Sequence, residues 1–319
     1  MQSRLKITAL RRTLRLSLVH QMNSPGLQTL DKMFLRKAIL ILLCVAAVST
    51  TQHAQEKSVS ASCIPVKTVS DDSLAFAHGE EATFILHYEW GMLDSDVGSA
   101  TVRLDSLTFN GQKAYRCTMH GSTTRIYDLF FKVREDFQSW FTRDGLRPLK
   151  FYRHSQEGDY EARNSYVYDW NAAEPVIRAD LYTSKVGASN VDIPLNPCTF
   201  DLPTLFYYAR NMNFDIIKPG RKYPMTFAID DEVFNVYFIL HGRETVKVPG
   251  IGTVRTIRFG AKLLEGEVFK GEADMIIWVS DDGNRLPVLF EAPLLIGTAK
   301  GRMTSYKNLK YPFTSLVLK

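Results

Sequence analysis

Residues 79–91 read GEEATFILHYEWG, and the order of side chains in this stretch decides the fold class. Phe84, Leu86, Tyr88 and Trp90 are each separated by a single residue, so an extended chain places them on one face. A period of two among β-branched and aromatic residues is typical of a strand with one buried face. The stretch therefore predicts a β-strand that ends at the glycine after it.

The same alternation continues towards the C-terminus and is broken about every 8–12 residues by Gly, Asn or Asp, which is typical of antiparallel sheet. One helix interrupts it, at residues 201–214, where Asp201 is a suitable N-cap and Pro203 stands in the first turn. We predict an all-β, mainly antiparallel fold, either an open or half β-barrel or a sandwich, with this one short helix. The apolar residues at helical spacing are Leu202, Leu205, Phe206, Ala209 and Met212.

One string of residue types occurs twice, 138 positions apart: WFTRDGLRPLKF at residues 140–151 and WVSDDGNRLPVLF at residues 278–290. Asp-Gly supplies the positive φ of a tight hairpin turn, the aromatic residues pair across the hairpin, and Pro suits the start of a strand. Every residue type has a local structural role, so the string predicts two hairpin turns and no catalytic signature. The residues assigned to these turns are Trp140, Asp144, Gly145, Trp278, Asp282 and Gly283.

The repeat predicts one β-rich domain, residues 79–319, with two similar halves at about 79–195 and 215–319 on either side of the helix. Residues 55–78 are rich in Ser, Ala, Lys and Val without a sustained period, and we interpret them as a linker.

The beginning of the chain has the pattern of a secretory leader. From Met33 a positive region with Arg36 and Lys37 precedes an apolar run of 11 residues, 38–48, and a cleavage site is plausible near Ala54. The run is shorter than the roughly 20 residues of a membrane span. We therefore predict a true start at Met33, a leader within residues 1–54, export to the periplasm or envelope, and no transmembrane span in the mature chain.

Net charge excludes one class of partner. The whole chain carries +5, but residues 1–54 hold eight Lys or Arg and one Asp, which leaves 31 basic and 33 acidic residues, a net charge of −2. A near-neutral chain with interspersed charges lacks the basic surface of a nucleic-acid binder.

Four cysteines give no disulfide framework. Cys44 follows Leu42 and Leu43 inside the apolar run, which disfavours a lipid anchor there. Of the others, Cys117 is predicted to be buried, while an odd count leaves Cys63 and Cys198 undecided.

No motif for catalysis, a cofactor or a metal is present. The chain has no Gly-x-Ser-x-Gly elbow and no phosphate-binding Gly-rich loop before a helix, and SDDGN at residues 280–284 lacks the ligand spacing of a calcium loop. After the leader no two histidines lie within four residues of each other, so no helical zinc pair exists. The predicted set of catalytic residues, metal ligands and cofactors is therefore empty.

Aromatic residues make up 12% of the chain and form its best functional lead. Most are expected in the core, but a curved sheet that does not close also exposes an apolar concave face to a lipid or another hydrophobic ligand. Tyr207, Tyr208 and Arg210 fall on or beside the polar side of the predicted helix, and we assign them to ligand binding.

Several stretches, in this order, resemble a family of uncharacterised exported bacterial proteins, domain of unknown function 3108, of Bacteroidetes type. They are GEEATFILHYEWGMLDSDVGSATV, SWFTRDGLRPLKFYRHSQEGDY, DLPTLFYYAR, PGIGTVRTIRF and IIWVSDDGNRLPVLFEAPLLIGT, and they run from Gly79 to the C-terminus. The resemblance implies an exported, β-rich protein without accepted catalytic residues, with a sheet similar to the half-barrels of periplasmic lipoprotein carriers. Likeness of fold does not establish function.

Three functions stay open from the sequence. The favoured one is a non-enzymatic envelope protein that binds a hydrophobic small molecule, a lipid or an envelope component in the concavity of the sheet. The others are a hydrolase acting on envelope glycan or lipid, and a structural partner of another envelope protein. A binder needs an apolar groove, an enzyme needs converging titratable groups with shifted pKa values, and a scaffold needs an exposed apolar patch.

Overall fold

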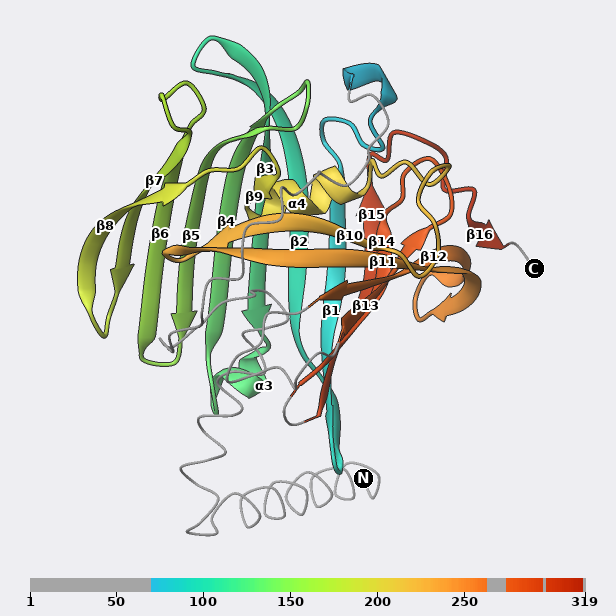
Figure 1. Cartoon of the computed structure of the whole chain (residues 1–319). Coiled ribbons are helices and arrows are strands. Elements are labelled where there is room, and N and C mark those ends of the chain that lie inside the picture. Colours follow the sequence, from blue (N-terminus) through green and yellow to red (C-terminus); the bar gives the residue numbers. More distant parts are fainter. Residues whose placement is uncertain (1–69, 263–273, 295–296, 318–319) are drawn as a thin grey trace.

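The computed structural model describes residues 70–262, 274–294 and 297–317. Within these ranges the chain forms one sheet of 16 strands, in the order β8-β7-β6-β5-β4-β3-β2-β1-β15-β14-β13-β12-β11-β10-β9, with β16 beside β12. Its ends at β8 and β9 are not joined to each other, so the sheet is curved but open (Figure 1). The predicted all-β fold of the open-barrel kind is confirmed. The predicted leader and residues 55–69 lie outside the described residues.

The strands are β1 (Glu81–Trp90), β2 (Leu93–Phe109), β3 (Gln112–Thr123), β4 (Val133–Thr142), β5 (Pro148–Glu157), β6 (Tyr160–Asp169), β7 (Val176–Thr183), β8 (Gly187–Pro194), β9 (Thr199–Phe200), β10 (Lys222–Ile229), β11 (Glu232–Val248), β12 (Gly252–Lys262), β13 (Asp274–Ser280), β14 (Pro287–Pro293), β15 (Thr298–Lys307) and β16 (Leu316–Val317). The helices are η1 (Asp71–Ser73), α3 (Arg125–Asp128) and α4 (Leu202–Ala209).

From β1 to β8 and from β10 to β15 each strand pairs antiparallel with the next, as local hairpins require, and β9 with β10 is the parallel pair among the described strands. The pairing that joins the beginning of the sheet to its end is β1 with β15, where Leu86 lies opposite Gly301. In Figure 1, β10 and β11 run across the face of the upright strands β2–β6. The sheet therefore folds over its own inner face, and this face is where the core forms.

Burial follows the alternation in the sequence. Along β1 every second residue is buried, among them Phe84, Leu86 and Tyr88. The largest core cluster combines residues of β1–β4, such as Phe84 and Leu104, with residues of β10–β13, such as Met225 and Ile257. Strands from both predicted halves thus contribute to one hydrophobic core.

The predicted linker of residues 55–78 is wrong at its end. Leu74 and Phe76 are both fully buried, and they pack into the largest core cluster. Phe76 meets the ring of Tyr207 at a centroid distance of 4.6 Å. Ordered packing therefore begins at least five residues before Gly79. No periodic pattern in the sequence of this segment predicts it.

The cysteines differ in state. Cys117 is fully buried and free, as predicted for a core residue, whereas Cys198, which the sequence left undecided, is disulfide-bonded. Burial raises the pKa of the Cys117 thiol well above its usual value, which makes it unreactive.

Candidate functional site

The inner face of the sheet encloses an apolar cavity of about 260 Å³. Its walls come from strands β1–β4 and β10–β14 and from α4 with the residues after it. Among the described lining residues, only Arg210, Tyr237 and Arg285 have a nitrogen or oxygen atom in the side chain. An apolar cavity of about 150 Å³ in another protein stays dry and binds benzene. The larger cavity here has room for a longer apolar group, such as one acyl chain.

Helix α4 forms one wall because the residues on one of its sides line the cavity, while those on the other side, Pro203, Thr204, Tyr207 and Tyr208, are buried. Asp201 caps it, and its carboxylate accepts the backbone N–H of Thr204 at 2.9 Å. This confirms the predicted start of the helix, although the helix ends at Ala209 and not near residue 214. All the residues predicted at helical spacing line the cavity: Leu202, Leu205, Phe206, Ala209 and Met212.

The sequence assigned three residues to ligand binding: Tyr207 and Tyr208 on the opposite side of α4, and Arg210 directly after the helix. Their predicted position on a polar side is wrong, because Tyr207, Tyr208 and Arg210 are 0%, 6% and 2% exposed. Tyr208 packs on Phe200 with ring centroids 4.3 Å apart. The hydroxyl of Tyr207 is buried and has no hydrogen-bond partner among the described residues, and burial raises its pKa well above the usual value.

Arg210 contributes to the cavity wall, but its charge is already compensated. Its Nη2 donates to Glu80 Oε2 at 2.8 Å, to the carbonyl of Asn284 at 2.9 Å and to the carbonyl of Ala75 at 3.2 Å. The pair with Glu80 raises the pKa of Arg210, which keeps it charged in spite of burial. Arg210 therefore links α4 to the segment before β1 and to the β13–β14 loop.

Arg285 is the other cation on the cavity wall, and its environment differs. Its Nη1 donates to the carbonyl of Met212 at 2.8 Å, and its guanidinium lies over the ring of Phe214, 4.6 Å from the centroid. Within the described ranges no carboxylate lies within ion-pair distance of it. Burial lowers its pKa, and the more distant charges of Asp215 and Asp281 oppose that effect.

The repeated string lies at two equivalent turns of the sheet. Trp140 lies two residues before the end of β4 and Trp278 two residues before the end of β13, and in both hairpins the strand register shifts directly after the Trp. The residue that follows each Trp is opposite the Pro of the string, Pro148 or Pro287.

The turns themselves are wider than the tight Asp-Gly turns that the sequence predicted. Asp144 and Gly145 lie in a loop closed by Thr142 N to Arg147 O at 2.9 Å, and Gly145 has the expected positive φ of 79°. In the second loop the positive φ is at Arg285 and not at Gly283.

Asp282 has a role of its own in that second loop. Its Oδ2 accepts the hydroxyl of Ser315 at 2.8 Å, and its Oδ1 accepts the N–H of Asn284 at 3.0 Å. Asp282 thus fastens the C-terminal segment to the β13–β14 loop. These contacts are structural, and none of them involves the cavity.

A buried polar group, which we call the Arg153 cluster, was missed by the sequence reasoning. It consists of Glu135, Arg153, Ser155, Glu157 and Asp230. Arg153 Nη1 lies 3.3 Å from Asp230 Oδ1, and Arg153 Nε lies 3.6 Å from Glu135 Oε2. Ser155 Oγ donates to Glu135 and lies 3.0 Å from Glu157 Oε1. The signal was present: residues 153, 155 and 157 continue the inward phase that Phe151 begins on β5.

The electrostatics of the Arg153 cluster centre on Glu157. Burial raises its pKa to about 8, and the neighbouring carboxylate of Glu135 adds to the shift. Ser155 has one hydroxyl hydrogen, which it donates to Glu135, so a protonated Glu157 is suited to donate to the Ser155 oxygen. Since Glu135 and Glu157 are 0% and 7% exposed, the two carboxyl groups are closed off from solvent.

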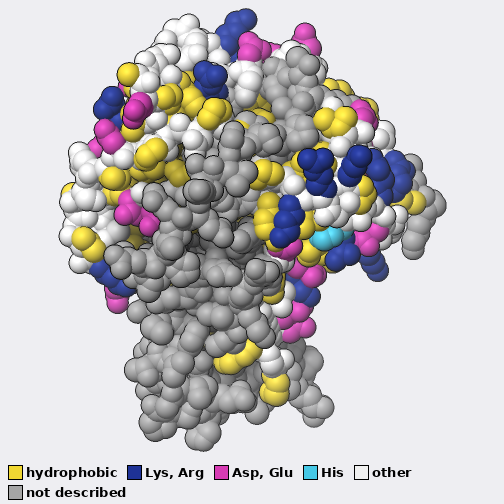
Figure 2. All heavy atoms as spheres, viewed as in Figure 1, with side chains coloured by type: hydrophobic (Ala, Val, Ile, Leu, Met, Phe, Trp, Pro, Cys, Tyr) yellow, Lys and Arg dark blue, Asp and Glu magenta, His cyan; other side chains and the backbone are white. Residues whose placement is uncertain are grey.

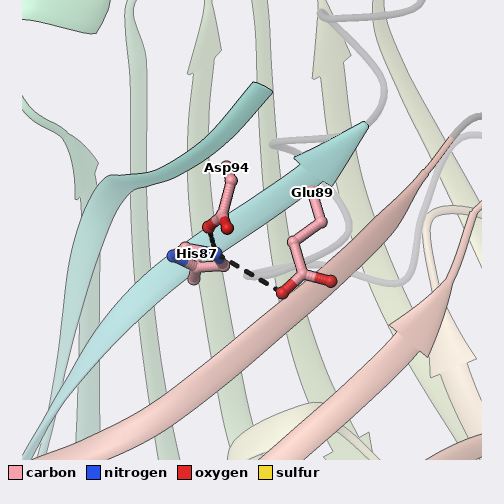
Figure 3. Close-up of side chains that lie close together, drawn as sticks. All are labelled: His87, Glu89 and Asp94. Carbon is pink, nitrogen blue, oxygen red and sulfur yellow. Dashed lines mark ion pairs between the residues drawn. The ribbon is translucent and has the colours of Figure 1, made fainter. Parts of the chain in front are cut away.

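One group has the composition of a metal site. His87 and Glu89, both on β1, and Asp94, opposite Glu89 on β2, offer ligand atoms within 4.8 Å of one another (Figure 3). His87 Nε2 lies 2.7 Å from Asp94 Oδ1 and 3.6 Å from Glu89 Oε1. Nitrogen and carboxylate oxygen are donors that suit Zn²⁺.

Basic side chains already compensate this group. Lys300 Nζ is 2.7 Å from Glu89 Oε1, and Arg302 binds Asp96, which in turn contacts His87 Nδ1 at 3.0 Å. An ammonium group beside a carboxylate competes with a metal cation for it. The group is therefore best described as a surface ion-pair network at the β1–β2 hairpin.

No described helix has the length and hydropathy that crossing a membrane would require. A search of curated proteins finds no match. Among solved structures, the chain is similar to a β-barrel-like protein of domain of unknown function DUF1849 from Brucella abortus, with 10% identity, a TM-score of 0.49, and coverage of 73% of this chain and 98% of that one. A proposed lipoprotein from Parabacteroides distasonis aligns with 8% identity, a TM-score of 0.31, and coverage of 74% and 99%.

The model of one protein family, described as protein of unknown function DUF3108, matches residues 83–304. This range contains most of β1, all of β2–β14 and α4, and most of β15, and so every described wall of the cavity. It also covers well over half of the chain, which therefore belongs to the DUF3108 family.

Proposed function

We propose that this protein is an exported envelope protein that binds an elongated apolar ligand, such as an acyl chain, in the cavity under its curved sheet, without chemical turnover. The observation that carries the proposal is the cavity of about 260 Å³ with three polar-bearing residues among its described lining. Export rests on the leader pattern of residues 33–54.

The chemistry of the cavity wall supports binding over catalysis. Phe206, Phe238 and Phe290 present aromatic surface from three different elements. Burying apolar area in such a site contributes roughly 25 cal/mol per Å². An ionisable group placed to attack a ligand is missing from the described wall, because Arg210 and Arg285 are its only ionisable members apart from Tyr237.

The Arg153 cluster is the strongest support for the alternative of a hydrolase. A glycosidase needs two carboxyl groups on either side of a substrate bond, about 5–9 Å apart. In the cluster Ser155 occupies the space between Glu135 and Glu157, and both carboxyl groups are buried. This arrangement supports a structural network better than a catalytic cleft.

Native mass spectrometry of the protein, purified from its own envelope without detergent, tests the proposal. We expect a reproducible added mass that organic extraction releases. We also expect that the extracted protein regains it from a lipid extract of the host. A protein that stays at its apo mass after incubation with that extract would contradict the proposal and favour the scaffold alternative.

A variant that fills the cavity provides the specific test. Ala261 lies on the cavity wall, so Ala261→Phe places a ring inside it and is expected to abolish the added mass. Ala188→Phe, at an exposed position of β8, adds the same ring outside the cavity and serves as the matched control. Equal ligand loads in the two variants would place the ligand elsewhere on the protein.

A further inference from the structure

The two arginines of the cavity wall differ in one respect that bears on the ligand. Arg210 is paired with Glu80, at 2.8 Å between Nη2 and Oε2. Arg285 has no ion pair in the described part of the chain. A cation that is partly withdrawn from water and lacks a counter-ion is costly to hold. An anion that binds at this wall therefore gains the most binding free energy at Arg285.

The guanidinium of Arg285 also has hydrogen-bond donors to spare. Its Nη1 is held by two carbonyls, that of Met212 at 2.8 Å and that of Arg210 at 3.4 Å. Phe214 supports its face by a cation–π contact at 4.6 Å. Among the described residues no acceptor is bonded to Nη2 or Nε, and neither atom is fully buried. The side chain is thus fixed in place while two of its nitrogens remain available.

Arg285 places a polar group on a wall that is otherwise mostly apolar. Arg285 lies in the β13–β14 loop next to the segment after α4, whereas Leu86 and Ala292 line the cavity from the cluster of β1, β2, β14 and β15. A ligand that touches all three needs a polar head and an apolar tail.

We propose that the cavity takes a single-chain amphiphile with a carboxylate head group, and that Arg285 binds the carboxylate while the chain lies against β1–β3 and β12–β14. This inference rests on the proposed function, because it names the class of ligand for the same cavity. A planar guanidinium with two free nitrogens matches the two oxygens of a carboxylate.

The surface charge around the site suits an anionic ligand. Figure 2 shows Lys and Arg side chains gathered on the right of the visible face, over the region of β10–β12. The exposed basic residues there include Arg221, Lys222, Arg243 and Lys247. Asp215 and Asp281 also lie near Arg285 but beyond ion-pair distance, and Arg243 pairs with Asp281 at 3.1 Å. A basic surface beside a site raises the rate at which anions reach it.

Calorimetric titration with decanoate and with decan-1-ol, each below its aggregation concentration, tests the inference on the delipidated protein. The two probes share a chain and differ in the head group. We expect the wild type to bind decanoate about tenfold more tightly than decan-1-ol, as a charge-assisted bidentate contact implies. Arg285→Gln should bring the two affinities to the same value and leave that for decan-1-ol unchanged, while Arg285→Lys should keep part of the preference.

Arg178→Gln is the control for net charge, because Arg178 is exposed on β7 and outside the cavity; it should keep the full preference. Retained binding of decan-1-ol shows that Arg285→Gln is folded. A wild type without preference for decanoate, or an Arg285→Gln variant that loses both probes equally, would overturn the inference and leave the proposed function intact. Failure of the wild type to bind either probe would overturn both.

Discussion

Glu157 shows at the scale of one residue how the inner face of the sheet holds a polar group. It occupies an inward position of β5, where the neighbours on the strand face are Ser155 and Arg153. Burial disfavours the charged form of a carboxyl group, and Glu135 nearby disfavours it further. The pKa of about 8 means that folded Glu157 keeps its proton at neutral pH.

This proton links stability to pH. The carboxyl of Glu157 ionises near pH 4.5 in the unfolded chain and near pH 8 in the folded one, so between these values the folded state binds more protons. The free energy of unfolding should therefore fall as pH rises through this window, by up to about 1.4 kcal/mol per pH unit. Urea unfolding at about pH 5 and about pH 8 should show that Glu157→Gln removes this contribution. The exposed Glu174→Gln serves as the control. If the free energy of unfolding changes with pH equally in Glu157→Gln and Glu174→Gln, Glu157 is ionised in the folded protein.

The pair of Arg210 and Glu80 makes a second prediction for single residues. Both side chains are 2% exposed, so removing one partner leaves a buried charge without compensation. Glu80→Gln should lower the free energy of unfolding by roughly 3–5 kcal/mol. Glu81→Gln, one position along, breaks a surface pair with Lys307 and should cost far less, because water screens that pair. Similar losses in the two variants, measured by urea unfolding, would contradict a buried ion pair at Arg210.

At the scale of elements, α4 is held at its N-terminus by one carboxylate. Asp201 is fully buried, and besides capping Thr204 it accepts hydrogen bonds from Ser139 Oγ at 2.9 Å and from the Tyr168 hydroxyl at 3.2 Å. The helix is thereby fixed to β4 and β6, with its apolar side towards the cavity. The cap therefore also determines the shape of the cavity wall.

Replacing this cap should affect stability and binding together. Asp201→Ala leaves buried donors of Ser139, Tyr168 and Thr204 without their acceptor, and we expect a loss of roughly 2–4 kcal/mol in the free energy of unfolding. Asp201→Asn keeps an acceptor oxygen and should lose less. Thermal unfolding measures both, with the exposed Asp231→Ala as control. An Asp201→Ala variant as stable as the control would show that α4 is held by packing alone.

The sheet as a whole is joined at β15, which pairs with β1 on one side and with β14 on the other. Gly301 lies at this junction, and a Cβ at this position would overlap the ring of Phe290 on β14. Gly301→Ala should therefore cost roughly 1–3 kcal/mol, and Phe290→Leu should relieve part of it.

One core contains residues of both parts of the sheet. The loss of stability in Gly301→Ala should therefore affect both parts together. We expect a single urea transition for Gly301→Ala, seen alike by tryptophan fluorescence and by far-ultraviolet circular dichroism. Two separate transitions would mean that β1–β8 and β9–β16 are stable independently.

Local signals in the sequence predict the strands well and their distant partners poorly. The alternation of Phe84, Leu86 and Tyr88 gives the face and the period of β1, and Asp201 with Pro203 gives the start of α4. Nothing near β1 indicates that its second neighbour is β15, more than 200 positions away. Pairings of this kind depend on the packing of the whole sheet.

The candidate site is less predictable for the same reason. The apolar face of α4 could be found from spacing, but the choice between Arg210 and Arg285 as the ligand cation could not. Arg210 is neutralised by Glu80, 130 positions before it. Arg285 lies on the wall because of the β13–β14 loop, which in the sequence looks like an ordinary turn. The Arg153 cluster escaped notice because inward-facing charged residues look like surface residues when no partner is visible.

The β1–β15 pairing also has a consequence for synthesis of the chain. A ribosome synthesises β1 early and β15 near the end of the chain. The edge of β1 that pairs with β15 therefore stays unpaired while more than 200 residues are added. An unpaired edge in a strand that carries Phe84, Leu86 and Tyr88 invites pairing with other chains. We therefore expect a chain that ends before Thr298 to aggregate instead of folding, because β1 never receives this partner strand.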